Sequence, residues 1–198
     1  MILTVNCGNT HTTFGCVGEA DRVERVFKLP TGLTETSFGY AAKIRQVLAL
    51  WGMENTPFEG AVISCVVPPL TEVFAEAMKL LGIDRPLVLG AGVKSGLHLC
   101  INDPGTVASD LVAAAVGVKE HYPLPCVAVD MGTATTFTVV DGKGRYIGGA
   151  ICPGVHLSLD ALSKGTALLP RIDLQAPRSA IGANKLDCMR AGAVFGSA

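Results

Sequence analysis

The sequence predicts an α/β protein made of two similar halves, and three observations support this. The chain has 198 residues, of which 49% are hydrophobic and 17% charged, enough apolar material for a packed core. Its first part reads as three strands followed by helix, strand, helix and strand. Three strands followed by helices recur after His121-Tyr122-Pro123. We therefore place one half at residues 1–119 and the other at residues 120–198.

The first half begins with apolar and alternating stretches that are typical of strands. The predicted strands are Ile2–Val5, Thr12–Cys16, Arg22–Leu29, Ala61–Val67 and Pro86–Leu89. A helix is predicted over Thr36–Trp51, because apolar side chains recur there at helical spacing, with Ser37 as its N-cap. A second helix is predicted over Thr71–Leu81, ended by Gly82.

The second half repeats the three strands but not the whole pattern. The predicted strands are Cys126–Asp130, Thr135–Val140 and Tyr146–Ile151, with a turn at Asp141-Gly142. Helices are expected at Val155–Ser163 and Asn184–Gly196, and no closing strand–helix–strand unit follows them. Such a sheet would keep unpaired backbone groups at one edge. We therefore expect another chain to cover it, or the sheet to be rearranged.

Composition argues against several classes of protein. The net charge is -1, which does not favour a nucleic-acid-binding surface. The start MILTVNCG does not read as a signal peptide. No apolar run approaches the ~18 residues of a membrane span. The seven cysteines are scattered and none forms a CxxC pair, so we expect free thiols in a cytoplasmic protein rather than disulfides or a zinc site.

A short polar loop occurs once in each half. VNCGNTHTTFG at residues 5–15 aligns with VAVDMGTATTFTV at residues 127–139, so that Gly8 matches Gly132 and Thr12 matches Thr136. These glycines allow a ligand to approach the backbone closely. Neighbouring N–H groups and polar side chains can bind phosphate oxygens; these residues are Asn9, Thr10, Thr133 and Thr135. Two glycine hairpins without a ligand are the alternative, but two Thr-rich copies favour a clamp for a nucleotide's phosphates.

Two further polar residues are candidates for binding or catalysis. Asp110 lies near the start of an Ala-rich helix within residues 102–117. It is either a general base toward a substrate hydroxyl or a charge favoured by the helix dipole. Thr166 lies in a loop, where it contacts a polar substrate or is a surface residue. His156 is interpreted as a helix-start residue rather than a ligand.

Several motifs together resemble the type III pantothenate kinases. They are CGNTHTTFG at 7–15, VISCVVPPL at 62–70, DMGTATTF at 130–137 and GGAICPGVHLSLDAL at 148–162. The resemblance implies two ribonuclease-H-like halves of the actin/Hsp70/sugar-kinase superfamily. It implies phosphorylation of pantothenate by ATP, the first step of coenzyme A synthesis. It also implies a cytosolic dimer that needs Mg²⁺ and a monovalent cation, K⁺ or NH₄⁺.

The resemblance assigns roles residue by residue. The first phosphate loop of the family, DxGNT, becomes Asn6-Cys7-Gly8-Asn9-Thr10, with Asn6 at the magnesium position. The second is Asp130-Met131-Gly132-Thr133, with Asp130 also a candidate for the monovalent cation. Asp110 corresponds to the base that also binds pantothenate. Thr166 falls where a threonine of the dimer mate reaches pantothenate.

Three departures from the family pattern bear on activity. Asn6 replaces a carboxylate, and Leu111 replaces the arginine of the family's GADR motif, here Ala108-Ser109-Asp110-Leu111. A glycine-rich segment that contacts adenosine in relatives is expected after Gly196 and is not in the sequence. Two interpretations follow. The chain is a kinase subunit that needs a related partner chain, a full-length or complementary paralogue in a hetero-oligomer, or it is a non-catalytic binding or regulatory member of the family.

Overall fold

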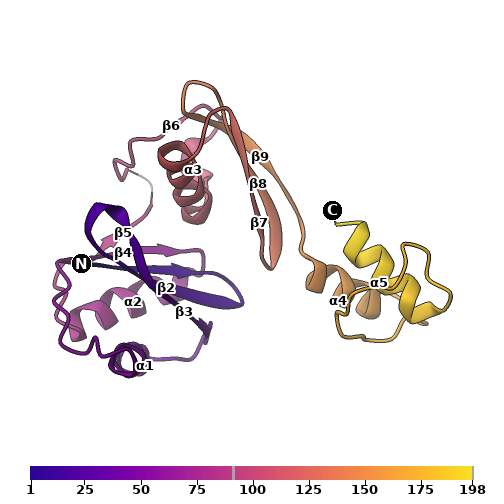
Figure 1. The fold of residues 1–198 in the computed structure, drawn as a ribbon, viewed down its shortest axis with the longest axis horizontal. Coiled ribbons are helices and arrows are strands. Elements are labelled where there is room, and N and C mark those ends of the chain that lie inside the picture. The colour runs from indigo at the N-terminus through magenta and orange to yellow at the C-terminus, as the bar shows by residue number, and fades with distance from the viewer. Residues whose placement is uncertain (91, 198) are drawn as a thin grey trace. The chain divides into compact units, whose positions relative to one another are not determined.

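The computed structural model describes residues 1–90 and 92–197, which form two compact units (Figure 1). Unit 1 consists of Met1–Leu97 and Ile101–Gly117, and unit 2 of His98–Cys100 and Val118–Ala198. Each unit contains one sheet with helices, so the α/β prediction is confirmed. Among the described residues, no helix has both the length and the apolar character needed to cross a bilayer.

Unit 1 is built on a five-stranded sheet. Its strands are β1 (Ile2–Cys7), β2 (His11–Val17), β3 (Val23–Pro30), β4 (Gly60–Cys65) and β5 (Leu87–Val88). Their order is β3-β2-β1-β4-β5, with β1 central, antiparallel to β2 and parallel to β4. All five predicted strands are present, with ends shifted by a few residues because hydrogen bonding, not composition, sets where a strand stops.

Helices α1 (Ser37–Leu50) and α2 (Pro68–Leu80) lie together on one face of this sheet (Figure 1). The core forms there, since alternate residues of β1 point to the helices and are buried. Phe14 stacks on Phe27 with ring centroids 4.7 Å apart. The predicted N-cap of α1 is wrong by one residue: Thr36, not Ser37, accepts the Gly39 N–H at 3.1 Å.

Helix α3 (Ser109–His121) is the predicted Ala-rich helix, and it begins in unit 1. Short 3₁₀ turns occupy Glu19–Asp21 and Pro104–Thr106. The division between the units falls after Gly117, and the short segment His98–Cys100 belongs to unit 2 because β6 pairs with a strand there. No sequence pattern marks that two-residue strand.

Unit 2 contains a four-stranded sheet of order β6-β9-β8-β7. The strands are β6 (His98–Leu99), β7 (Cys126–Met131), β8 (Ala134–Val140) and β9 (Arg145–Pro153). Helices α4 (Val155–Gly165) and α5 (Lys185–Phe195) pack on each other through Leu159, Met189 and Ala193. Strand β7 ends the sheet among the described residues, and Val127, Val129 and Met131 are exposed along it.

Candidate functional site

The first polar loop, Gly8–Thr10, joins β1 to β2 and is held by Thr31. The Gly8 N–H donates to the His11 carbonyl at 3.1 Å, which closes the turn. The Thr31 hydroxyl donates to the Gly8 carbonyl at 2.8 Å, and the Thr31 N–H donates to the Thr10 carbonyl at 2.9 Å. The loop is therefore fixed from behind while Asn9 and Thr10 face solvent. Thr31 belongs to no motif, so only the fold reveals its role.

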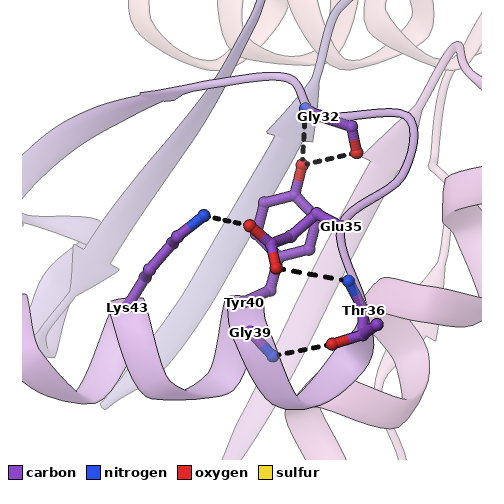
Figure 2. Close-up of polar contacts among 6 residues, drawn as sticks. All are labelled: Gly32, Glu35, Thr36, Gly39, Tyr40 and Lys43. Carbon is purple, nitrogen blue, oxygen red and sulfur yellow. Dashed lines mark hydrogen bonds and ion pairs between the residues drawn. The ribbon is translucent and has the colours of Figure 1, made fainter.

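A polar network at the start of α1 holds the segment that follows Thr31 (Figure 2). The buried Tyr40 hydroxyl accepts the Gly32 N–H at 3.0 Å. Glu35 pairs with Lys43 and also accepts the Thr36 N–H, and the Lys43 ammonium holds the pKa of the Glu35 carboxyl below its usual range. These contacts fix the chain beside Thr31 and so support the first polar loop indirectly.

The second loop, Gly132-Thr133, joins β7 to β8 and is closed by two backbone hydrogen bonds. The Gly132 N–H donates to the Ala134 carbonyl at 3.1 Å, and the Gly154 N–H donates to the Thr133 carbonyl at 3.0 Å. A Cβ at Gly154 would collide with the carbonyl oxygens of Gly132 and Thr133. Glycine at 154 is thus required for this close approach.

The two loops differ in length by one residue, which corrects the alignment made from the sequence. Cys7 pairs with Thr12, whereas the corresponding Met131 pairs with Thr135. The structural counterpart of Thr12 is therefore Thr135 and not Thr136. Both side chains are buried, so Thr135 is a structural residue beneath its loop as well as a candidate phosphate contact.

Asn6 and Asp110 belong to the same region of unit 1. In the parallel β1–β4 pair Asn6 lies opposite Ser64, so their side chains share the face away from the core residues. The Ser64 hydroxyl lies 3.0 Å from that of Ser109, the first residue of α3. This hydrogen bond ties the start of α3, which carries Asp110, to the carboxyl end of β4 beside Asn6. Ligands of open α/β sheets bind at such carboxyl ends.

Asp110 has a local partner. Its Oδ1 accepts the N–H of Leu111 at 2.8 Å in the first turn of α3, where the helix dipole also favours a negative charge. The carboxylate keeps a second oxygen for other contacts. Leu111 is partly buried and brings no positive charge to this position. Both the catalytic and the structural interpretation of Asp110 agree with this arrangement.

Among the described residues, the oxygen atoms near either polar loop are too few to hold a metal ion permanently. They fit better a metal ion that arrives bound to a phosphate. Within residues 1–90 and 92–197, no group of three or more His, Cys, Asp and Glu side chains could hold a metal. Asp130 presents an exposed carboxylate at the end of β7, and Asn6 presents an exposed amide oxygen at the end of β1. Mg²⁺ bound to nucleotides uses one or two carboxylates, phosphate oxygens and water, and Asp130 by itself offers such a carboxylate in unit 2.

Thr166 is the C-cap of α4 and is exposed. Its hydroxyl donates to the Leu162 carbonyl at 2.8 Å and accepts the Leu169 N–H at 3.3 Å. These contacts end the helix and start the following turn. The residue therefore has a clear local role, and a contact with substrate remains a proposal.

Two cysteines lie beside the first loop. Cys7 and Cys65 end β1 and β4 and are paired in register. The hydrogen bond between their thiols raises the pKa of the buried Cys7 and lowers the pKa of Cys65. Burial raises the pKa of Cys16 on β2. Cys65 is therefore the more readily ionised of the pair.

Solved structures support the fold. A protein from Campylobacter jejuni described as a Baf family transcriptional activator is 19% identical, with a TM-score of 0.59 over 98% of this chain and 75% of that one. A protein from Sinorhizobium meliloti described as a 2-dehydro-3-deoxygalactonokinase is 11% identical, with a TM-score of 0.53 over 99% of this chain and 78% of that one. At these identities the likeness concerns the fold alone.

Sequence comparison is more specific. The family model for type III pantothenate kinase matches residues 2–198. A type III pantothenate kinase of Anaeromyxobacter sp. (strain K) is 39% identical over 99% of this chain and 77% of its own length. The corresponding protein of Moorella thermoacetica is 37% identical over the same shares. The matching residues include both polar loops, and this chain belongs to the type III pantothenate kinase family.

Proposed function

We propose that this chain takes part in the ATP-dependent phosphorylation of pantothenate, the first step of coenzyme A synthesis, as a subunit beside a related chain. The observation that carries the proposal is the hydrogen bond between Ser64 and Ser109, which ties Asp110 to the end of the sheet where the first loop begins. Family membership supplies the reaction and its substrates. Seven free cysteines favour a reducing compartment, the cytoplasm.

In this proposal each polar element has one task. Asp110 accepts the proton of the pantothenate hydroxyl as that oxygen attacks the γ-phosphorus of ATP. The loops at Gly8–Thr10 and Gly132-Thr133 bind phosphate oxygens through N–H groups and side chains. Asp130 holds a cation, either Mg²⁺ arriving with ATP or the monovalent K⁺ or NH₄⁺. The bound Mg²⁺ supplies neutralisation of phosphate charge.

Asn6 and Leu111 are the reasons for proposing a partner chain. A carboxylate at position 6 would attract a cation by about 4 kcal/mol per unit charge at a separation of about 4 Å near a protein surface. The Asn6 amide loses that attraction, which corresponds to about three decades in rate. Leu111 also lacks the forked donors that bind a carboxylate such as that of pantothenate. A partner of the same family supplies these groups in a dimer, where Thr166 reaches the mate's pantothenate.

The test measures ADP release with ATP, Mg²⁺, K⁺ and pantothenate. The isolated chain is compared with the chain co-purified with a paralogue from its genome that carries DxGNT and GADR. We expect no turnover from the isolated chain and turnover from the complex. The matched control is Asp110→Asn in this chain within the complex, which lowers turnover if the chain contributes a base.

The remaining outcomes separate the alternatives. Rapid turnover by the isolated chain would show a kinase that needs no partner. A complex whose turnover is unchanged by Asp110→Asn would show a non-catalytic regulatory chain. Calorimetric titration of the isolated chain with pantothenate and with Mg²⁺ and ATP gives a second measure, because a binding module retains affinity without turnover.

A further inference from the structure

Cys7 and Cys65 lie side by side across two neighbouring strands. They are the last residues of β1 and β4, which are parallel, and the register places them opposite each other. Neighbouring strands are about 4.8 Å apart, within the range of Cα separations, about 4.4–6.8 Å, that a disulfide joins. Residues in register point to the same face, and both side chains contact the core.

The two sulfurs differ in their exposure to solvent. Cys7 is completely buried, whereas Cys65 is partly exposed. Cys65 also lies two residues before Val67, the N-cap of α2, and its thiol donates to the Val67 carbonyl at 3.2 Å. The positive end of a helix favours a thiolate. Cys65 is thus accessible to a small oxidant, and Cys7 is placed to react next.

Cys16 is an internal comparison. It is as deeply buried as Cys7 and belongs to the same core. In its strand, however, Cys16 faces Leu3 on β1 and Arg25 on β3, so it has no thiol in register. Burial alone therefore does not distinguish Cys7, and its position opposite Cys65 does.

We infer that Cys7 and Cys65 are a paired oxidation site. A small hydroperoxide oxidises them, and a disulfide forms between the two residues across strands β1 and β4. The Cys65 sulfur attacks one peroxide oxygen and the O–O bond breaks. With hydrogen peroxide, the products are a sulfenic acid at Cys65 and one water. The Cys7 sulfur then attacks the Cys65 sulfur, the S–O bond breaks, and the hydroxyl leaves as a second water. Two thiols lose two hydrogens, and one peroxide becomes two waters.

The site lies next to the first polar loop, because Gly8 follows Cys7 directly. The Gly8 carbonyl is already fixed by Thr31, so a covalent link one residue earlier joins β4 to the same loop. Oxidation is therefore expected to slow the hydrogen exchange of the loop amides. A reductant such as dithiothreitol reverses the link. This chemistry does not depend on kinase activity.

The test maps disulfides in the purified, reduced chain after treatment with hydrogen peroxide. Tryptic peptides 1–22 and 46–79 are expected to appear linked when the digest is kept unreduced, since the first contains Cys7 and the second Cys65. Cys65→Ser is expected to abolish the link. Cys16→Ala is expected to retain it, which excludes Cys16 as the residue joined in peptide 1–22.

Two results would overturn the inference. One is the absence of this linked peptide at a peroxide dose that oxidises the exposed Cys188. The other is a linked peptide that survives Cys7→Ala. Because Cys7 is buried, the fluorescence of Trp51, which contacts Phe27 in the same core, checks that each variant is folded.

Discussion

The strand that precedes the polar loop is central in unit 1 and lies at the edge in unit 2. In unit 1, β1 pairs with β2 and β4, and Val5 is 2% exposed. In unit 2, the corresponding β7 pairs only with β8 among the described strands, and Val129 is 52% exposed. Val5 pairs with Phe14 just as Val129 pairs with Phe137. The same local pattern is therefore buried in unit 1 and exposed in unit 2, because neighbouring strands and helices decide burial.

The largest expected effect comes from placing a charge on each of these strands. Val5→Asp buries an unpaired carboxylate in the core of unit 1 and is expected to destabilise it by about 4 kcal/mol or more. Val129→Asp leaves its carboxylate exposed and is expected to change stability by less than about 1 kcal/mol. Urea denaturation of the two variants measures the difference. Similar large losses would show that the β7 edge is covered in solution.

A second comparison uses the paired aromatic residues. Phe14→Ala removes a fully buried ring that contacts Phe27 and Phe74, and is expected to cost about 3–5 kcal/mol. Phe137 is only partly buried, so Phe137→Ala is expected to cost less than half as much. The single tryptophan, Trp51, reports the unfolding of unit 1. If Phe137→Ala moves the Trp51 transition as far as Phe14→Ala does, the two units unfold together.

A third comparison tests the supports of the two loops. Thr31→Val removes the hydroxyl that donates to Gly8 and is expected to cost about 1–2 kcal/mol, with faster amide exchange confined to the first loop. Gly154→Ala forces the second loop away from the chain after β9 and is expected to make the amides of the second loop exchange faster. Amide exchange followed by mass spectrometry measures both. Faster exchange spread evenly over both units would contradict separate supports.

The smallest expected effect concerns the turn between β8 and β9. Arg145 holds the pKa of the Asp141 carboxyl down at about 2, through a charged hydrogen bond and backbone N–H groups. A depressed folded-state pKa means that the ionised carboxylate stabilises the turn above the unfolded value of about 4. That contribution is lost as pH falls from about 4 toward 2. Thermal melting of Asp141→Asn is expected to lack this acid-dependent step.

Local patterns predicted most of the fold and only part of the site. Apolar periodicity located the strands and helices within a few residues, because burial of one face repeats along an element. The two loops are recognisable in the sequence as a repeat. Their one-residue difference in length is seen only from the strand pairing, which joins Cys7 to Thr12 and Met131 to Thr135. Thr31 and Ser64 act through partners distant in sequence, so no local pattern predicts them.

The closure of both loops has a consequence for how the repeat arose. Thr31 directly follows β3, which ends at Pro30, and Gly154 directly follows β9, which ends at Pro153. Thr31 donates its backbone N–H to the loop between β1 and β2, and Gly154 donates its backbone N–H to the loop between β7 and β8. Neither loop is completed by a two-stranded hairpin alone. A gene segment duplicated to carry this loop must therefore have encoded all three strands and the residue after them.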